Sequence, residues 1–288
     1  MFVIRKNFRY PNNRELSRAV KIGRQTQKST AISTANAEAI IVRGRDLCSE
    51  LIGRIGFTDH MWLLITGELP SVAQRRVLDA TLIAIAEHGL VPSVQASRMT
   101  LAAAPDALQG AVAAGILGCG SVILGASETA GRLFNDVEAQ MNAGRSLDDA
   151  ALAVVRTWRE RKQAIAGYGH PLHKRRDPRV DALFAVAREQ GADLRYVAIA
   201  EAVERAIPQV LGRELKLNVS AAIPAVLLGI GFPAQALRGV PILARSASLI
   251  AHLQEEIETP IGFALSHQAT RDVEYSGEIP PGVSLKAE

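Results

Sequence analysis

The sequence of 288 residues is poor in cysteine, in aromatic residues and in long hydrophobic runs. Two cysteines cannot build a disulfide scaffold, and neither Cys48 nor Cys119 stands at a metal-ligand spacing. Both lie among apolar residues, so we expect two buried free thiols in a reducing compartment. No stretch reaches the roughly 18 uninterrupted apolar residues that span a bilayer, and the first residues contain no apolar, signal-like core. We therefore predict a cytoplasmic protein without a membrane partner.

The composition is that of a globular chain with an uneven distribution of charge. Apolar residues make up 48% and charged residues 22%, which excludes disorder, and the length predicts about two domains. Residues 1–30 hold eight lysines and arginines against one glutamate, a net charge of +7, whereas the whole chain carries +4 and the remainder therefore −3. We interpret residues 1–30 as a basic N-terminal arm, solvated or wrapped round another subunit. Nucleic acid is the less favoured partner, because the arm has few aromatic residues and no motif.

Helical periodicity runs through nearly the whole chain from about residue 45. Ser71 begins a capping-box pattern before a helix that should stop at Gly89. Ser146, and Asp177 with the proline that follows it, mark two more helix starts. Further helices are expected over 59–67, 106–118, 127–143, 194–206, 219–230 and 240–257. The sequence thus predicts an all-α fold.

Two stretches differ from this helical pattern. The residues Ile40–Val42 are β-branched and follow a polar stretch, which predicts a minor N-terminal β-hairpin within residues 30–42. Residues 110–125 are rich in glycine and alanine. Because small side chains let backbones approach closely, we interpret this stretch as a tight helix pair or a subunit interface, with ordinary core packing as the open alternative.

The densest functional signal is the segment AGYGHPLHKRRDPR at residues 166–179. Gly167 and Gly169 flank Tyr168 and can adopt backbone torsions closed to other residues, so the loop can bend round a ligand and present His170. A basic cluster follows next to a helix start, which is a natural site for a polyanion. Its members are His173, Lys174, Arg175, Arg176 and Arg179.

This segment resembles the GxGH-Pro-x-x-Lys-x-x-DPR segment of citrate synthases and of the citryl-CoA lyase module of ATP-citrate lyase. Four more segments are similar to blocks of those proteins, in the same order, over about residues 30–260. They are residues 43–71, AEHG at 86–89, KLNVSAAIPAVLLGIGFP at 216–233 and PILARSASLIAHLQEE at 241–256. The chain thus resembles the citrate synthase superfamily, and within it the short citryl-CoA lyase-like proteins most strongly.

The resemblance implies an all-α, citrate-synthase-like two-domain helical subunit. Residues 31–124 and 229–288 would form a large domain, over which a small domain of residues 125–228 would close. The resemblance also implies a homodimer or higher homo-oligomer with shared active sites. Coenzyme A would enter as acyl-CoA substrate or product, with a dicarboxylate or keto acid as the second small molecule and no metal.

The resemblance also implies roles for the residues that match the family's motifs. His170 would polarise the ketone carbonyl of oxaloacetate, as a donor at the developing alkoxide. Arg179 and Arg245 would grip carboxylates, which suit a bidentate guanidinium, and His88 would hydrogen-bond the keto acid. Coenzyme A would be bound by Gly167, Tyr168, Gly169, Lys174, Arg175 and Arg176.

Two positions depart from the family pattern. Ile123, or Leu124 in the alternative register, stands where citrate synthases place a histidine that stabilises the enol of acetyl-CoA. Ser220 stands where they place the aspartate that removes a methyl proton, and a serine at its normal pKa is no base for that step. A catalytic role left to Ser220 is to stabilise an enolate through its hydroxyl, with backbone N–H groups as the alternative donors.

Two functions therefore stay open. We favour a carbon–carbon lyase or synthase that cleaves a citryl-CoA-type thioester to acetyl-CoA and oxaloacetate. Cleavage starts from an alcohol that His170 can deprotonate, whereas synthesis depends most directly on the missing aspartate. The alternative is a catalytically altered or inactive homologue that binds coenzyme A or a dicarboxylate. Structural roles are assigned to His60, His252 and His267.

Overall fold

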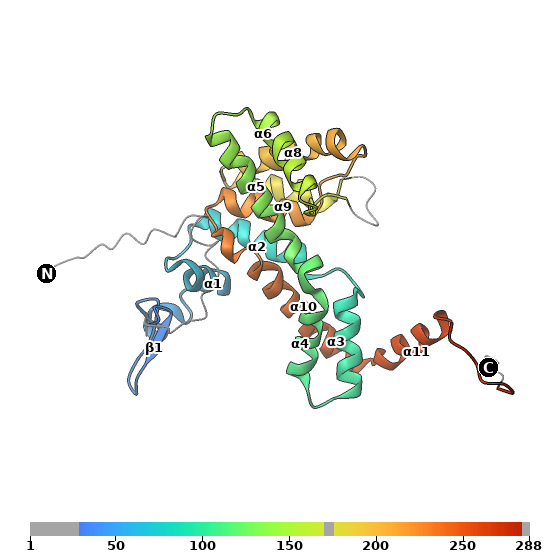
Figure 1. The fold of residues 1–288 in the computed structure, drawn as a ribbon. Coiled ribbons are helices and arrows are strands. Elements are labelled where there is room, and N and C mark those ends of the chain that lie inside the picture. Colours follow the sequence, from blue (N-terminus) through green and yellow to red (C-terminus); the bar gives the residue numbers. More distant parts are fainter. Residues whose placement is uncertain (1–28, 170–175, 284–288) are drawn as a thin grey trace. The chain divides into compact units, whose positions relative to one another are not determined.

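The structure is a computed structural model that describes residues 29–169 and 176–283 (Figure 1). Its internal contacts divide the chain into two units, Met1–Ile52 and Gly53–Glu288. The predicted all-α fold is confirmed, because the described residues form helices and one small sheet. Three predicted site residues, His170, Lys174 and Arg175, lie outside the described residues.

The first unit contains, in its described part, a small antiparallel sheet. The strands β1 (Ser33–Ala35), β2 (Ile40–Val42) and β3 (Arg45–Asp46) pair in that order. The first two form the predicted hairpin, and the Asn36 Oδ1 closes its turn by accepting from the backbone amides of residues 38 and 39 at 2.9 and 2.8 Å. The third strand was not predicted, because two residues show no alternation.

Cys48 is exposed, so the expectation that both cysteines are buried is wrong for this one. It belongs to η1 (Leu47–Leu51), a single helical turn capped by Asp46, whose Oδ1 accepts from the Cys48 amide at 3.0 Å. Of this turn only Leu51 is buried, because so short an element turns one side chain inward. Cys119 is buried, as expected.

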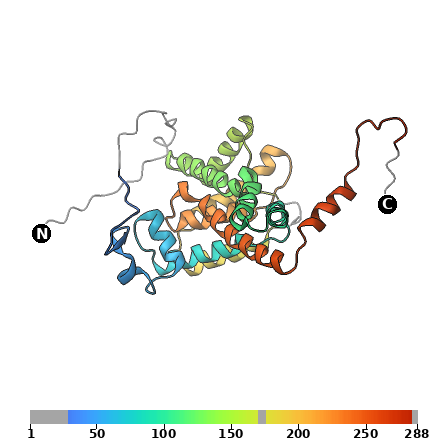
Figure 2. The ribbon, with the colours of Figure 1, turned by 90° about the horizontal axis from the view of Figure 1, so that it is seen from below.

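The second unit consists, in its described residues, of helices joined by loops (Figures 1 and 2). Its elements are α1 (Phe57–Thr66), α2 (Val72–Ala86), α3 (Pro92–Ala103), α4 (Leu108–Cys119), η2 (Gly120–Leu124), α5 (Gly125–Asn142), α6 (Leu147–Glu160), α7 (Pro178–Glu189), α8 (Arg195–Leu211), α9 (Val219–Gly229), η3 (Ala234–Ala236), α10 (Gly239–Glu258) and α11 (Gly262–Asp272). The predicted caps Ser71, Ser146 and Asp177 are all confirmed, since each side chain accepts from a backbone amide of the first turn.

Two helices were missed and one ends early. The helix α3 escaped the periodicity analysis because polar residues, Ser93, Ser97 and Arg98, occupy its buried face. The helix α11 is almost wholly exposed and has no apolar stripe to read. The helix α2 ends at Ala86 instead of running on to Gly89, because residue 87 leaves the helix in an extended conformation.

Contacts between helices form two groups within the second unit. The helices α5, α6, α7, α8 and α9 pack on one another around the largest apolar core, and the helices α3, α4, α10 and α11 pack together. The helix α2 contacts α7, α9 and α10, so it touches both groups. The boundaries predicted for a large and a small domain, at residues 124/125 and 228/229, stay a prediction.

The glycine-rich stretch at residues 110–125 makes a tight contact between helices, which is one of the alternatives predicted for it. A Cβ at Gly115 of α4 would lie 2.6 Å from Leu249 Cδ1 of α10 and 3.0 Å from the backbone oxygen of Ser93 of α3. By length and composition alone, the continuous helical stretch Leu108–Asn142 is apolar enough to cross a membrane, with a mean hydropathy of 1.7 in its most apolar window. Only 33% of that window is buried. Leu117 of α4 and Val122 of η2 are among its exposed apolar side chains.

Candidate functional site

The glycine loop is bonded to the chain just before α9. The Gly169 amide donates to the Lys216 carbonyl at 2.6 Å, and the Asn218 amide donates to the Gly167 carbonyl at 2.9 Å. Asn218 also donates from Nδ2 to the Gly169 carbonyl at 2.6 Å. Gly167 has φ +90°, and a Cβ there would lie 2.4 Å from the Ala221 Cβ, so only glycine fits.

Tyr168 is buried within this loop. Its hydroxyl donates to the Ala200 carbonyl at 2.9 Å, and burial raises the pKa of the phenol well above its ordinary value. The described part of the loop thus uses Gly167, Tyr168 and Gly169 to anchor itself on α8 and α9. Their predicted contact with coenzyme A stays a prediction, as do the roles of His170, Lys174 and Arg175.

Ser220 lies in the first turn of α9, beside the anchored loop. Four backbone amides of that turn, those of residues 219–222, already donate to protein acceptors. The Asn218 Oδ1 accepts from the Ser220 amide at 2.9 Å, and the Asp177 Oδ2 accepts from the Val219 amide at 3.2 Å. Two kinds of donor were considered for stabilising an enolate, backbone amides and the Ser220 hydroxyl. Because the amides of this turn already donate to protein acceptors, the hydroxyl is the better candidate.

The buried carboxylate of Asp177 pairs with the half-buried guanidinium of Arg179 at the start of α7. The Asp177 carboxylate accepts from Arg179 Nη2 at 2.7 Å and from Arg179 Nε at 3.0 Å, as well as from two backbone amides. Burial by itself raises the pKa of this carboxyl, but the hydrogen bonds and charge of Arg179 outweigh it and bring the pKa below the ordinary value. Asp177 is thus a fixed anion and a weak base, and it orients Arg179.

Arg245 differs from Arg179, because two of its guanidinium nitrogens, Nε and Nη1, are buried without a hydrogen-bond partner among the described residues. The residue is 5% exposed, and neither Nε nor Nη1 has a hydrogen-bond partner within residues 29–169 and 176–283. Burial lowers its pKa, the Cys119 thiol and the Glu87 carboxylate raise it, and the charge of Arg179 lowers it, with a net pKa below the ordinary value. A buried, unpaired guanidinium is costly, so this position calls for an anion.

The sequence analysis missed the carboxylate of Glu87, which forms the turn that carries His88. Its Oε1 accepts from the backbone amides of His88, at 2.8 Å, and of Gly89. Gly89 has φ +71°, as a residue that closes such a turn must. A glutamate that ends a helix just before a glycine was the available signal, because a side chain there can accept from the amides that follow. His88 itself is half-buried.

Three predicted site residues thus belong to one region. Arg245 on α10 lies within electrostatic reach of Arg179 on α7 and of Glu87, whose turn presents His88. Ser220 is connected to the same region through Asp177, which bonds both Arg179 and the start of α9. Two cations beside a histidine are what a dicarboxylate needs for recognition.

Ile123 and Arg176 complete the predicted set. Ile123 lies in η2 with 42% of its surface exposed, whereas Leu124, the alternative register, is buried. Arg176 forms ion pairs with Asp181 at 3.4 Å and Glu201 at 3.3 Å, and its guanidinium lies 5.5 Å from the Phe184 ring centre. Arg176 is thus held against α7 and α8, with its role toward coenzyme A untested.

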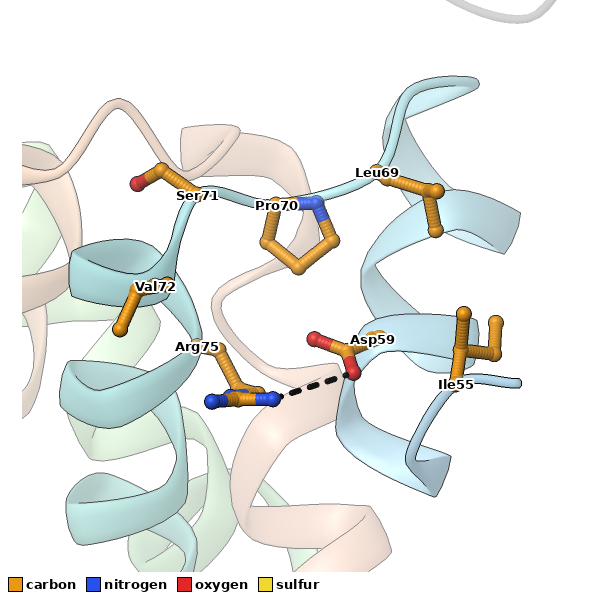
Figure 3. Close-up of a pocket in the computed structure, with 7 residues that line it drawn as sticks. All are labelled: Ile55, Asp59, Leu69, Pro70, Ser71, Val72 and Arg75. Carbon is orange, nitrogen blue, oxygen red and sulfur yellow. Dashed lines mark ion pairs between the residues drawn. The ribbon is translucent and has the colours of Figure 1, made fainter. Parts of the chain in front are cut away.

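Two surface cavities lie elsewhere. One, of about 190 Å³, is shown in Figure 3, where an ion pair between Asp59 and Arg75, 3.6 Å long, faces Leu69 and Pro70. The other, of about 320 Å³, lies between α5 and α6 beside Trp158. Neither is lined by a predicted site residue. Among the described residues, no group of three histidine, cysteine or acidic side chains is arranged to hold a metal ion.

Comparison with known proteins identifies the family of the chain. Residues 71–261 match the family described as citrate synthase, C-terminal domain, and the chain therefore belongs to the citrate synthase family. It is 29% identical over 212 residues to citrate/2-methylcitrate synthase of Bacillus subtilis, covering 70% of this chain and 53% of that protein. It is 25% identical over 199 residues to citrate synthase of Haloferax volcanii, covering 68% and 50%. The chain thus spans about half the length of these curated relatives.

Solved structures give the same fold over more of the chain. Citryl-CoA lyase from Hydrogenobacter thermophilus superposes with a TM-score of 0.76 at 32% identity, covering 89% of this chain and 97% of that one. ATP citrate lyase of Methanosaeta concilii, solved as the D541A mutant with (3S)-citryl-CoA, superposes with a TM-score of 0.72 at 21% identity, covering 91% and 43%. The second likeness shows the fold alone. The citrate-synthase-like, all-helical fold predicted from the sequence is confirmed.

Proposed function

We propose that this protein cleaves a citryl-CoA-type thioester to acetyl-CoA and oxaloacetate. The observation that carries the proposal is that Nε and Nη1 of the buried Arg245 have no hydrogen-bond partner among the described residues, while Arg245 interacts electrostatically with Arg179 and with Glu87 of the His88 turn. A citryl group has free carboxylates for such cations, and bidentate carboxylate binding favours arginine. The likeness to a citryl-CoA lyase over 97% of that chain supports the same chemistry.

Cleavage needs a base and a donor. The base takes the proton of the tertiary hydroxyl, the alkoxide becomes the ketone of oxaloacetate, and the carbon–carbon bond breaks. Its electron pair passes to the thioester enolate, which then takes a proton and becomes acetyl-CoA. We assign the base to His170 and the donor at the enolate oxygen to the Ser220 hydroxyl. Arg245 would hold a carboxylate of the departing oxaloacetate.

Coenzyme A, the homodimer and the location belong to the same proposal. The glycine loop, followed by the basic residues at 174–176, supports coenzyme A as the carrier of the acyl group. An exposed apolar stripe on α4 and η2, with Leu117 81% and Val122 85% exposed, supports self-association. We assign the protein to the cytoplasm, because the α4 part of its apolar stretch at 108–142 packs against α3 and α10 of the same helical unit.

One observation favours a second function. The family's aspartate is replaced by Ser220, and the carboxylate bonded to the same turn, Asp177, is fixed by four hydrogen bonds and has a lowered pKa. A site with its cations intact and no free base in that turn suits a homologue that binds coenzyme A or a dicarboxylate without turnover.

The two functions separate in one experiment. Purified protein and its Arg245→Ala and His170→Ala variants are incubated with citryl-CoA, and the thioesters are followed by mass spectrometry against a no-protein control. The lyase proposal expects acetyl-CoA and oxaloacetate from the wild type. Each variant should cleave citryl-CoA at least about 10²-fold more slowly. Intact citryl-CoA that stays bound to the wild type contradicts the lyase and favours the binding protein.

A further inference from the structure

The helix α10 carries more of the site than Arg245. Arg245, Ser248 and His252 are spaced three and four residues apart, so their side chains leave the same face of the helix. All three are buried or nearly so, and 15% of the His252 side chain is exposed. Because α10 packs on α2, this face meets the end of α2, where the His88 turn begins. The sequence analysis treated His252 as a structural histidine, and Ser248 received no role.

The two α10 residues converge on one carboxylate oxygen. Glu87 Oε2 accepts from the Ser248 hydroxyl at 2.5 Å and lies 3.0 Å from His252 Nε2. The other oxygen of the same carboxylate, Oε1, holds the amides of the His88 turn. Glu87 therefore links two side chains of α10, Ser248 and His252, to two backbone amides of the His88 turn.

Glu87 is fixed as an anion by these contacts. Burial raises the pKa of its carboxyl, but the Ser248 hydroxyl, the Gly89 amide and His252 outweigh burial and lower the pKa. Every oxygen of the carboxylate is engaged, so Glu87 is poorly suited to take a proton from a substrate. Its charge also bears on Arg245, one turn along α10 from Ser248.

His252 has a second acidic neighbour. Its Nδ1 lies 4.0 Å from Glu255 Oε2, and that oxygen accepts from Arg98 Nη1 at 2.6 Å. The Arg98 guanidinium is itself buried and bonded to Glu256 at 2.6 Å. His252 thus lies between the carboxylates of Glu87 and Glu255, within hydrogen-bond distance of the first.

We propose that Ser248 and His252 are positioning residues of the carboxylate site. Acting through Glu87, they set the backbone of the His88 turn and place a negative charge beside Arg245. The inference rests on the proposed function for its ligand, because a clamp at this position serves a site in which His88 and Arg245 bind one dicarboxylate. Neither residue touches the reacting atoms in this account.

The test uses variants that remove or restore a donor. Ser248→Ala and His252→Leu each remove one, whereas Ser248→Thr and His252→Gln keep a donor near the same place. Gln254→Ala is the matched control, since this exposed α10 side chain donates to Glu258 at 2.9 Å, on a face away from Glu87. Hydrogen exchange of the His88 and Gly89 amides is measured first, because it reports on the clamp without any ligand.

We expect exchange at these two amides to be at least about tenfold faster in Ser248→Ala and His252→Leu, and restored in the conservative variants. Dissociation constants for oxaloacetate, measured by calorimetry, should rise by about tenfold in the same two variants, and any kcat for citryl-CoA should change less than KM. The Gln254→Ala control should match the wild type in every readout.

The outcomes are distinguishable. Unchanged exchange at His88 and Gly89 overturns the clamp, whatever the activity. Faster exchange with unchanged oxaloacetate affinity overturns the link between the clamp and the carboxylate site. Faster exchange and weaker oxaloacetate binding, in a wild type that leaves citryl-CoA intact, supports the clamp and contradicts only the lyase.

Discussion

Two arginines that the sequence treats alike have opposite surroundings. Arg179 and Arg245 were both predicted to grip carboxylates, and both belong to the same region of the fold. Arg179 is held by the buried carboxylate of Asp177, at 2.7 Å, whereas two nitrogen atoms of Arg245 are buried without a hydrogen-bond partner in the described residues. The difference depends on neighbours far away in the sequence, so no motif could reveal it.

This contrast predicts opposite changes in stability. Arg245→Met should raise the free energy of unfolding by about 1–3 kcal/mol, because it removes an unsatisfied buried group. Arg179→Met should lower the free energy of unfolding by about 1.5–3 kcal/mol, because the buried Asp177 carboxylate would lose its cationic partner and keep only two backbone amide donors. Denaturant titrations measure both. A loss in Arg245→Met as large as that in Arg179→Met would contradict the assignment of Arg245 as a vacant anion partner.

Ser220 gives a second prediction at this scale. Ser220→Asp restores a carboxyl at the start of α9, where the helix dipole also favours a negative charge. We expect turnover of citryl-CoA to fall by about 10²-fold all the same, because the variant loses the hydroxyl donor and places a negative charge beside the enolate oxygen. Ser220→Ala should lower turnover, because it removes the donor left at the enolate oxygen. Steady-state rates of citryl-CoA cleavage test both predictions. If Ser220→Ala is as fast as the wild type, Ser220 has no role in the mechanism.

Among the elements, the junction of α3, α10 and α11 rests on one buried ion pair. Arg98 of α3 donates from Nε to Glu256 at 2.6 Å, and Glu256 also accepts from the amides of Ile261 and Gly262 at the start of α11. Glu255 bonds the same arginine but is 61% exposed. Arg98 is thus bonded to a buried carboxylate, Glu256, and to an exposed one, Glu255.

We therefore expect Glu256→Gln to lower the free energy of unfolding by about 3–5 kcal/mol, and Glu255→Gln by at most about 1 kcal/mol. Burial raises the pKa of Glu256, but the Ile261 amide, Arg98 and the Gly262 amide bring it below its ordinary 4.5. Because the pKa of Glu256 is lower in the folded state, its contribution to the free energy of unfolding is complete above pH 4.5. That contribution is lost as the pH falls through the folded-state pKa. The difference between wild type and Glu256→Gln, measured by thermal unfolding, should accordingly shrink below pH 4.5. Equal losses in both variants would contradict the account.

Elements could be predicted where caps and apolar stripes agree. Ser71, Ser146 and Asp177 each gave a correct helix start, because capping is a local effect of one side chain on one turn. The helix α3 could not be found this way, since it buries Arg98 against carboxylates that come about 160 residues later. The candidate site divides similarly: matched residues such as Arg245 were named from the sequence, whereas Glu87 acts through tertiary contacts that the motif did not contain.

At the scale of the whole molecule, the apolar stripe on α4 and η2 predicts self-association. Leu117 and Val122 are 81% and 85% exposed, and exposed apolar patches of this kind mark interfaces. Sedimentation velocity should give a mass near twice the 30.9 kDa of the chain. Leu117→Asp with Val122→Asp should give the monomer mass, while the exposed Ile83→Asp, on α2, should not change it. A wild-type monomer at micromolar concentration would contradict the dimer.

The central claim is that Arg245 is the vacant partner of a substrate carboxylate. The most direct measurement is calorimetric titration of oxaloacetate into the wild type and into Arg245→Met, with Gln254→Ala as the control. The account predicts binding to the wild type and the control, and a dissociation constant at least about 10²-fold higher in Arg245→Met, from the loss of a charge-assisted bidentate contact. Equal affinity in all three proteins, or none in the wild type, would contradict it.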